Sequence, residues 1–443
     1  MKQCRKADLG LDGLMKLRKQ LTFVDRNGKQ TFVAYVENNE FIRVPKFFHI
    51  PSDPRIVGTT FVPACVAGAE MHFAMYGEAE ELRPLQAEAL AILLGRLERA
   101  TPLAPQGAVL CLPCGFGKTR TAILAIQRLG VKALVLASHS HLLQQFSKEA
   151  QRITQGLVVA KLPKSPETPL PEDAHIIFGT LQSVYCRKYP SRYWASIGLV
   201  VVDEAHHLAA PTFCQALCKL PVSRILALTA TPERKDGRED LIYYLAGDTA
   251  FRAYRAKDST VTIKFIKHSG VFATLLSHRY ESVGERMQML VELSECAERN
   301  AVLVRKIQKL AQSRRGILVL CKLVHHLHVL GDMCSAGADA IKDYGYFTGQ
   351  EKQAERELAA TRQVIFATFD MAKEGLDIPR LDTLVLASPA ESTIQCMGRV
   401  LREVPGKLRP LIIDVYDECV AFRGELWSRI RQFGETGASI LGL

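Results

Sequence analysis

Nine short apolar segments, most of them separated by helical stretches, restrict the possible folds of this chain more than any other feature. Each segment is about six residues long and apolar at nearly every position. Strands that bury both faces and alternate with helices form parallel sheets covered by helices. The sequence therefore predicts two tandem α/β domains with parallel sheets. The first series comprises residues 107–112, 133–138, 174–180, 197–203 and 225–231, and the second comprises 316–321, 363–369, 383–389 and 410–416.

The spacing of these segments suggests the domain boundaries. We expect a small β-rich N-terminal domain at residues 1–75 and a first α/β domain at 76–240. A connecting or inserted segment at 241–294 and a second α/β domain at 295–443 would follow.

Within the N-terminal region, residues 20–50 alternate apolar and polar positions around turn signals, which predicts a β-meander. Basic residues alternate there with aromatic ones, including Phe23, Phe32, Phe47 and Phe48. Such a mixture could stack nucleic-acid bases, or the aromatic side chains could form a core. The core interpretation is favoured.

The charge balance and the cysteines limit the class of protein. The 443 residues carry a net charge of +11, and the first sixty hold eleven Lys and Arg against six Asp and Glu. A basic excess favours an anionic partner such as nucleic acid. The twelve cysteines show no repeating spacing. No apolar run reaches the ~18 residues of a membrane span, and no secretory signal is recognisable. We expect a cytoplasmic protein with reduced thiols and no membrane partner.

The stretch CLPCGFGKTR at 111–120 has two possible interpretations. It lies between a strand and a helix and ends in Gly117-Lys118-Thr119, which is typical of a phosphate-binding loop. Lys118 would contact the β and γ phosphates, and the Thr119 hydroxyl would bind Mg²⁺. Alternatively, Cys111 and Cys114 could be half of a metal site, but no second pair follows at finger spacing. The nucleotide interpretation is favoured, and it makes the surrounding residues Leu112, Pro113, Cys114, Gly115, Phe116 and Arg120 candidate ATP contacts.

Two further motifs fit a nucleotide site. Asp203 and Glu204 follow an apolar strand, where Asp203 would bind Mg²⁺ and Glu204 would polarise the attacking water. The alternative is that both residues cap a helix N-terminus. In QCMGRVLR at 395–402, Gln395, Arg399 and Arg402 share one helix face. These arginines could be surface charge, or they could stabilise charge on the γ-phosphate from a second domain.

Together, in this order, these motifs resemble those of superfamily 2 helicases, specifically the DEAH type. The stretches LRPLQ, GTLQS and EGLDIP are most similar to the UvsW/XPB-like group, which includes phage branch-migration enzymes and helicases of large DNA viruses. Leu112 replaces the first glycine of the general loop pattern, as is common in superfamily 2.

The resemblance implies roles for further residues. Arg83 and Gln86 would read adenine, Gly375 and Asp377 would lie near the nucleotide, and His206, Thr229 and Thr231 would couple ATP hydrolysis to closure of the two domains. The implied nucleic-acid contacts are Ser138, His139, Gly179, Thr180, Cys321, Lys322, Thr348 and Thr368.

The resemblance also implies that both α/β domains are RecA-like, that the domain at 76–240 binds ATP and that the N-terminal domain at 1–75 could bind DNA. The implied activity is that of an ATP- and Mg²⁺-dependent DNA helicase that works in the cleft between the two domains. We expect it to act as a monomer on forked or branched DNA during replication, recombination or repair. One alternative is a helicase for RNA or RNA–DNA hybrids. Another is a nucleic-acid clamp that binds without unwinding.

Overall fold

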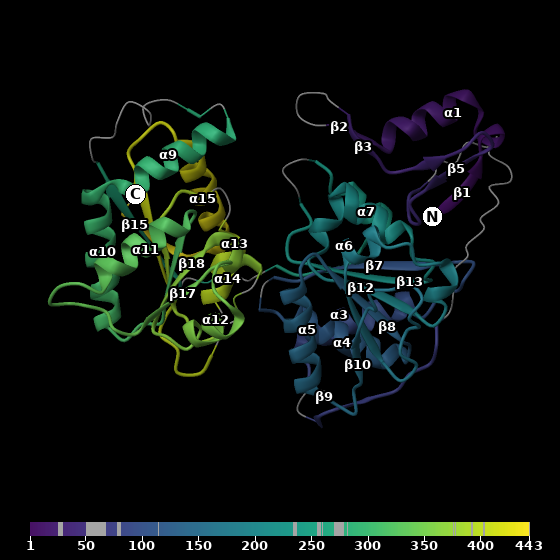
Figure 1. Ribbon diagram of the computed structural model, residues 1–443, viewed down its shortest axis with the longest axis horizontal. Helices are drawn as coiled ribbons and strands as arrows, with labels where there is room; N and C mark the ends of the chain where they lie inside the picture. The colour runs from purple at the N-terminus through teal and green to yellow at the C-terminus, as the bar shows by residue number, and fades with distance from the viewer. Residues whose placement is uncertain are drawn as a thin grey trace. The chain divides into compact units, whose positions relative to one another are not determined.

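The computed structural model describes residues 1–24, 30–49, 68–77, 81–113, 115–233, 237–254, 258, 260–269, 279–280, 282–374, 376, 378–390, 393–401 and 404–442. The chain forms two compact units, residues 1–254 and 255–443. Each unit contains a seven-stranded sheet whose paired strands all run parallel, with helices on both faces (Figure 1). The predicted pair of RecA-like parallel-sheet domains is therefore confirmed.

The first unit is built around the earlier series of apolar segments. Residues on opposite faces of a strand are both fully buried, as Leu134 and Val135 in the strand Ala133–Ala137 show. This burial explains why these strands are apolar throughout. In spatial order the strands are β10 (Val159–Lys161), β11 (Ile176–Thr180), β8 (Ala133–Ala137), β12 (Leu199–Val202), β13 (Arg224–Thr229), β7 (Gln106–Cys111) and β14 (Thr249–Arg252).

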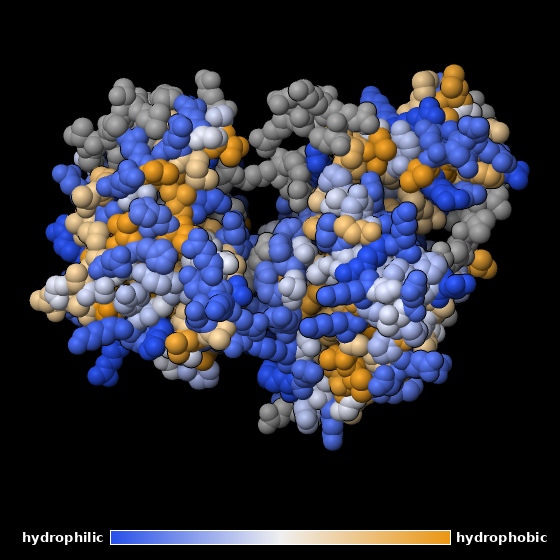
Figure 2. Space-filling model, viewed as in Figure 1, coloured by the Kyte–Doolittle hydropathy of each residue, from blue (hydrophilic) through white to orange (hydrophobic). Residues whose placement is uncertain are grey.

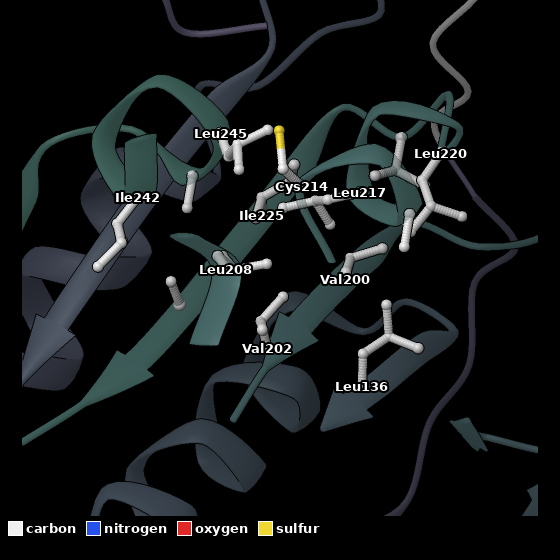
Figure 3. Close-up of a cluster of buried hydrophobic side chains, with 14 of the residues drawn as sticks. Leu136, Val200, Val202, Leu208, Cys214, Leu217, Leu220, Ile225, Ile242 and Leu245 are labelled. Carbon is white, nitrogen blue, oxygen red and sulfur yellow. The ribbon is translucent and has the colours of Figure 1, made fainter. Parts of the chain in front are cut away.

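Two hydrophobic cores cover the faces of this sheet. Helices α3 (Pro84–Leu97), α4 (Lys118–Leu129) and α5 (Ser140–Ile153) pack on one face. The opposite face is covered by α6 (Leu181–Cys186), η1 (Ser191–Trp194), η2 (Ala205–Ala209), α7 (Pro211–Cys218) and α8 (Asp240–Ala246). Figure 3 shows part of this second core, including Leu136, Val200, Val202, Leu208, Cys214, Leu217, Ile225 and Leu245.

The second unit repeats this plan. Its strands are, in spatial order, β17 (Tyr344–Phe347), β18 (Val364–Thr368), β16 (Ile317–Cys321), β19 (Thr383–Leu386), β20 (Leu411–Asp417), β15 (Thr262–His268) and β21 (Ser439–Leu441). Its helices are α9 (Val283–Glu295), α10 (Ala297–Gln312), α11 (Val324–Cys334), α12 (Gln353–Ala359), α13 (Phe369–Glu374), α14 (Ile394–Val400) and α15 (Arg423–Thr436).

The segment 241–294, expected to connect the two domains, is instead divided between them. Strand β14 pairs with β7 in the first sheet, and β15 pairs with β20 and β21 in the second. The physical reason is that Ile263 and Phe265 on one face of β15, together with the preceding Val261, are buried in the core of the second unit. The alternation of apolar and polar residues along one strand does not reveal which sheet that strand joins.

The N-terminal region packs onto the first unit. Its elements are β1 (Lys2–Arg5), α1 (Lys6–Gln20), β2 (Thr22–Val24), β3 (Gln30–Val33), β4 (Val36–Glu37) and β5 (Phe41–Val44). β2 pairs with β3, while β1, β5 and β4 form an antiparallel sheet, so the expected meander is split in two. Farther along, β6 (Ala74–Met75) pairs with β9 (Thr154–Gln155).

The segment that follows β5 anchors this region. The Lys46 Nζ donates hydrogen bonds to the backbone oxygens of Leu220 and Val222. The Phe47 N–H donates to the Tyr244 oxygen at 2.9 Å, and the buried Phe48 ring meets the Tyr244 ring edge-on at 4.8 Å between centroids. Phe48 thus belongs to the core, as the favoured interpretation predicted.

The surface is mainly hydrophilic on the face shown in Figure 2, with apolar residues in small groups. Across the described ranges, no helix is both long enough and apolar enough to cross a membrane.

Candidate nucleotide and nucleic-acid site

The order of the strands brings the motifs of the first unit to one edge of its sheet. Parallel strands end at the same edge, where α/β folds bind their ligands. Along this edge lie, in order, the ends of β11, β8, β12, β13 and β7. The motifs expected to contact nucleic acid follow β11 and β8, while the acidic pair and the phosphate loop follow β12 and β7. β13, which ends in Thr229, separates these last two strands.

The phosphate loop wraps tightly before helix α4. Gly117 is the N-cap of α4, and both Gly115 and Gly117 have φ of +84°, a left-handed conformation that favours glycine. The Lys118 Nζ donates to the Leu112 oxygen at 3.2 Å, so the amine lies across the loop. Leu112 is fully buried, and its N–H donates to the Thr229 oxygen at 3.2 Å. This position continues the sheet, which explains a leucine where the general pattern has glycine.

Gln86 links helix α3 to the loop. Its Oε1 accepts a hydrogen bond from the Arg83 N–H at 3.0 Å, and its Nε2 donates to the Phe116 oxygen at 2.9 Å. A Cβ on Gly117 would lie 2.1 Å from this Nε2, so a larger residue there would displace the Gln86 amide. The structure thus bonds Gln86 to the phosphate loop, whereas the resemblance implied that its side chain contacts adenine.

The other loop residues are held by local bonds. The Phe116 N–H donates to the Pro113 oxygen at 3.2 Å, and an Arg120 Nη donates to the Glu81 oxygen at 2.9 Å. Thr119 lies half-buried in the first turn of α4. Cys114 lies outside the described residues. Cys111 is buried in β7, and this burial raises the pKa of its thiol.

The acidic pair lies directly beyond β12. The Asp203 N–H donates to the Leu136 oxygen at 2.8 Å, and Asp203 Oδ1 accepts from the Glu204 N–H at 3.0 Å. Glu204 has φ of +47°, a left-handed conformation that a non-glycine residue rarely adopts. Its Oε2 lies 3.4 Å from His206 Nδ1. Glu204 precedes η2 but makes no side-chain capping bond to it, in contrast to the helix-capping alternative.

The residues expected to couple ATP hydrolysis to domain closure border this pair. Thr229 is fully buried, and its Oγ1 accepts from the Thr231 N–H at 3.2 Å, which stabilises a local turn. His206 stacks on His207 with ring centroids 4.3 Å apart, and His207 lies near His139 at 6.3 Å. A chain of imidazoles therefore links the acidic pair to the end of β8.

The expected nucleic-acid contacts of the first unit differ in exposure. His139 is exposed, and its Nδ1 lies 2.9 Å from the Ser138 hydroxyl. Thr180 caps helix α6, because its hydroxyl accepts from the Ser183 N–H at 3.1 Å. A Cβ on Gly179 would lie 2.9 Å from a Leu162 methyl group, so the Gly179 backbone packs closely against the Leu162 side chain.

In the second unit, two of the four expected contacts have buried side chains. Cys321 is fully buried, which raises its thiol pKa to about 12. Thr348 is also fully buried, and its hydroxyl donates to Glu351 at 2.6 Å. Neither side chain can reach a ligand in this conformation, so any contact would have to use the backbone. Lys322 and Thr368 are half-buried, and the Lys322 amine lies 3.6 Å from the Asp370 carboxylate.

Helix α14 carries the candidate arginine. Arg399 is half-buried, and its guanidinium donates to the oxygens of Ala372, at 3.0 Å, and Lys373 at the end of α13. Gln395, one turn earlier on α14, is also half-buried. The remaining expected residues Gly375, Asp377 and Arg402 lie outside the described residues.

Sequence reasoning missed a buried polar cluster below Cys321. Arg299 is fully buried, and its guanidinium donates to the Asp417 carboxylate at 2.7 Å and to the Ala387 oxygen at 2.8 Å. Burial opposes the charge on Asp417, but the adjacent Arg299 and His268 hold its pKa below the ordinary value. The helical spacing of Arg299, Leu303 and Ile307 was a usable signal, because it places the arginine on the buried face of α10.

Comparison with known proteins supports a helicase core. Residues 79–234 match the family described as type III restriction enzyme, res subunit. A protein of Acanthamoeba polyphaga mimivirus named an ATP-dependent RNA helicase is 24% identical over 390 residues, 87% of this chain and 73% of its own length. A protein of Frog virus 3 named a helicase is 28% identical over 296 residues, 65% of this chain and 64% of its own.

Two solved structures share the fold. Dbp5 of S. cerevisiae bound to RNA and ADP BeF3 aligns with a TM-score of 0.54 at 16% identity, covering 82% of this chain and 94% of that one. The Hef helicase domain of Pyrococcus furiosus gives 0.52 at 16% identity, covering 81% of this chain and 100% of that one. The family match, the viral relatives and the strand-end motifs together support a superfamily 2, ATP-dependent helicase.

Proposed function

We propose that this protein uses ATP hydrolysis to unwind or branch-migrate DNA, with forked or branched duplexes as its substrates. The observation that carries the proposal is the adjacency of β12, β13 and β7, which brings Glu204, Thr229 and Lys118 to one sheet edge. Gln86 is bonded to the same phosphate loop. A nucleotide-binding loop, an acidic pair and a hydroxyl pair on three neighbouring strands can couple phosphate chemistry to movement.

The residues present suit ATP and Mg²⁺. The backbone N–H groups at the start of α4, together with Lys118, would hold the phosphates. Thr119 and Asp203 offer the hard oxygen ligands that Mg²⁺ prefers, and the bound ion would neutralise phosphate charge. Glu204 would orient and deprotonate a water molecule. Arg399 of the second unit is our candidate for stabilising the γ-phosphate, which would require its release from the carbonyls of α13.

The decisive variant is Lys118→Ala. We expect it to abolish nucleic-acid-stimulated ATP hydrolysis and strand displacement, while Lys164→Ala, which removes an exposed lysine of the same unit, should keep both. Wild-type ATPase activity in Lys118→Ala would contradict the proposal. Binding of nucleic acid without any ATP-dependent remodelling by the wild type would instead favour the clamp alternative.

A second candidate is an RNA or RNA–DNA hybrid helicase, favoured by the viral relatives that are named RNA helicases. The two substrates can be separated by measuring ATPase stimulation and strand displacement with matched forks, Holliday junctions, R-loops and RNA duplexes. Stimulation by branched DNA but not by RNA duplexes would support our proposal. Displacement of RNA strands alone would support the second candidate.

A further inference from the structure

A cavity of about 420 Å³ opens in the second unit between the end of β15 and the first half of α10, away from the helicase motifs. Figure 1 shows these two elements next to each other. The lining combines basic groups with hydroxyl and imidazole side chains and one carboxylate. It comprises Lys267, His268, Ser269, Glu298, Ala301, Val302 and Arg305.

A group of lysines extends the basic character of this cavity along α10. Lys264 of β15 and Lys309 of α10 are exposed. The positive charge of Lys306 is repelled by the charges of both. Burial and these two like charges lower the pKa of Lys306. Within the described part of the chain, none of these three lysines has a carboxylate partner, nor does Arg305. At the rim, Lys267 is paired with Glu418 at 2.8 Å, and His268 Nδ1 lies 3.5 Å from the Asp417 carboxylate.

Crowded cations without carboxylate partners oppose folding, because like charges repel. The side of β15 that bears Lys264 also bears Ile266, which packs with α10 residues such as Leu303 and Ile307 in one core. Neutral side chains at the exposed positions outside this core would avoid the repulsion. An anionic ligand would relieve the repulsion, and the cavity offers it the Arg305 guanidinium.

The position of the cavity favours one class of anionic ligand. In the sheet, β16, β19, β20 and β15 are successive neighbours, so the end of β15 lies three strands from Cys321 and Lys322. At about 4.8 Å per strand this is about 14 Å. A strand of nucleic acid that passes over Lys322 could therefore continue along the same edge to the cavity. Continuity with that position favours a phosphate backbone over an acidic protein segment.

We propose that the groove formed by β15 and α10, with Lys264, Arg305, Lys306 and Lys309, binds the phosphate backbone of the nucleic acid on which the helicase acts. This inference rests on the proposed function and extends its contacts beyond the helicase motifs. Such contacts carry no sequence preference, because they reach only phosphate and sugar. They would increase the affinity of the second unit for the nucleic acid along which the helicase moves.

The test is a triple variant, Lys264→Ala, Lys306→Ala and Lys309→Ala, measured without nucleotide on a fluorescein-labelled single-stranded DNA. A matched variant carries Lys342→Ala, Lys352→Ala and Arg431→Ala, which removes the same charge from exposed positions elsewhere on the second unit. We expect the groove variant to bind at least about tenfold more weakly at 0.1 M salt. Its plot of log affinity against log salt should be less steep by about 2, since each lost phosphate contact contributes about 0.7.

Equal affinities and salt slopes for the groove and matched variants would overturn the inference. ATPase stimulation by nucleic acid in the wild type would then show that the proposed function stands without it. A wild type that neither binds nucleic acid nor responds to it would refute the proposed function itself. Binding of polyglutamate that depends on the groove, with unchanged DNA binding, would assign the groove to an acidic protein instead.

Discussion

The side-chain amide of Gln86 joins two backbone segments, accepting from the Arg83 N–H at 3.0 Å and donating to the Phe116 oxygen at 2.9 Å. Gln86 is 5% exposed, so its side-chain amide is largely shielded from water. Gln86 on helix α3 and Phe116 in the phosphate loop are 30 residues apart in the sequence. One buried amide therefore determines how the loop sits against the domain.

Replacing Gln86 by Glu should separate the two bonds. The carboxylate can still accept from Arg83 but can only repel the Phe116 oxygen, so we expect the loop to loosen. Leaving a carbonyl that is shielded from water without a donor costs about 1–3 kcal/mol, which corresponds to about a 5- to 150-fold loss of ATP affinity if the loop must reform on binding. Titration with a fluorescent ATP analogue measures this. Gln151→Glu, at an exposed position on α5, should leave the affinity unchanged.

Glu204 allows the backbone and the side chain to be tested separately. Its φ of +47° costs about 1–2 kcal/mol for a residue with a Cβ. Glu204→Gln keeps this cost and removes the carboxylate, so we expect a loss of ATPase activity of about 10²–10⁴-fold with unchanged stability. Glu204→Gly should be equally inactive but more stable by about 1 kcal/mol. Thermal unfolding and ATPase rates measure the two effects. A stable Glu204→Gln enzyme with full activity would exclude Glu204 as the base.

Much of this architecture could be predicted from the sequence because strands buried on both faces leave a strong apolar signal. The phosphate loop and the acidic pair were visible because each combines unusual residues with a strand end. The bond between Lys46 and the Leu220 oxygen was not visible, because it joins residues 174 positions apart. The same limit hid the assignment of β14 and β15 to different sheets, and the burial of Thr348, whose hydroxyl alone suggests an exposed contact.

Lys46 is expected to act as an anchor for the N-terminal region, despite its position in a basic, aromatic stretch. Its amine is buried and donates to the Leu220 and Val222 oxygens. Lys46→Met keeps the aliphatic chain but leaves both oxygens without this donor, which should lower the free energy of unfolding by about 1–3 kcal/mol. Arg43→Met, at an exposed position on β5, should cost less than about 1 kcal/mol. Urea denaturation compares them. Weaker DNA binding by Lys46→Met without destabilisation would instead support a nucleic-acid surface.

The buried His326 should make the second unit sensitive to mild acid. Its Nε2 lies 2.9 Å from Asn300 Oδ1 and its Nδ1 lies 3.4 Å from the Ser388 hydroxyl. Burial, reinforced by the Arg299 charge, lowers the pKa of His326 from 6.5 to about 3. Between these values the unfolded chain binds a proton that the folded chain does not. The contribution of neutral His326 to the free energy of unfolding is therefore fully present above pH 6.5. It falls by about 1.4 kcal/mol per pH unit as the pH drops toward 3.

His326→Gln removes this titration while retaining an amide that can bond to Asn300. We expect calorimetric unfolding of the full chain between pH 7.5 and 5 to show a smaller loss of stability for this variant than for the wild type. The difference should amount to about 2 kcal/mol at pH 5. His325→Gln alters the exposed neighbouring histidine and should follow the wild-type curve. Parallel curves for wild type and His326→Gln would show that His326 is not kept neutral by its buried site.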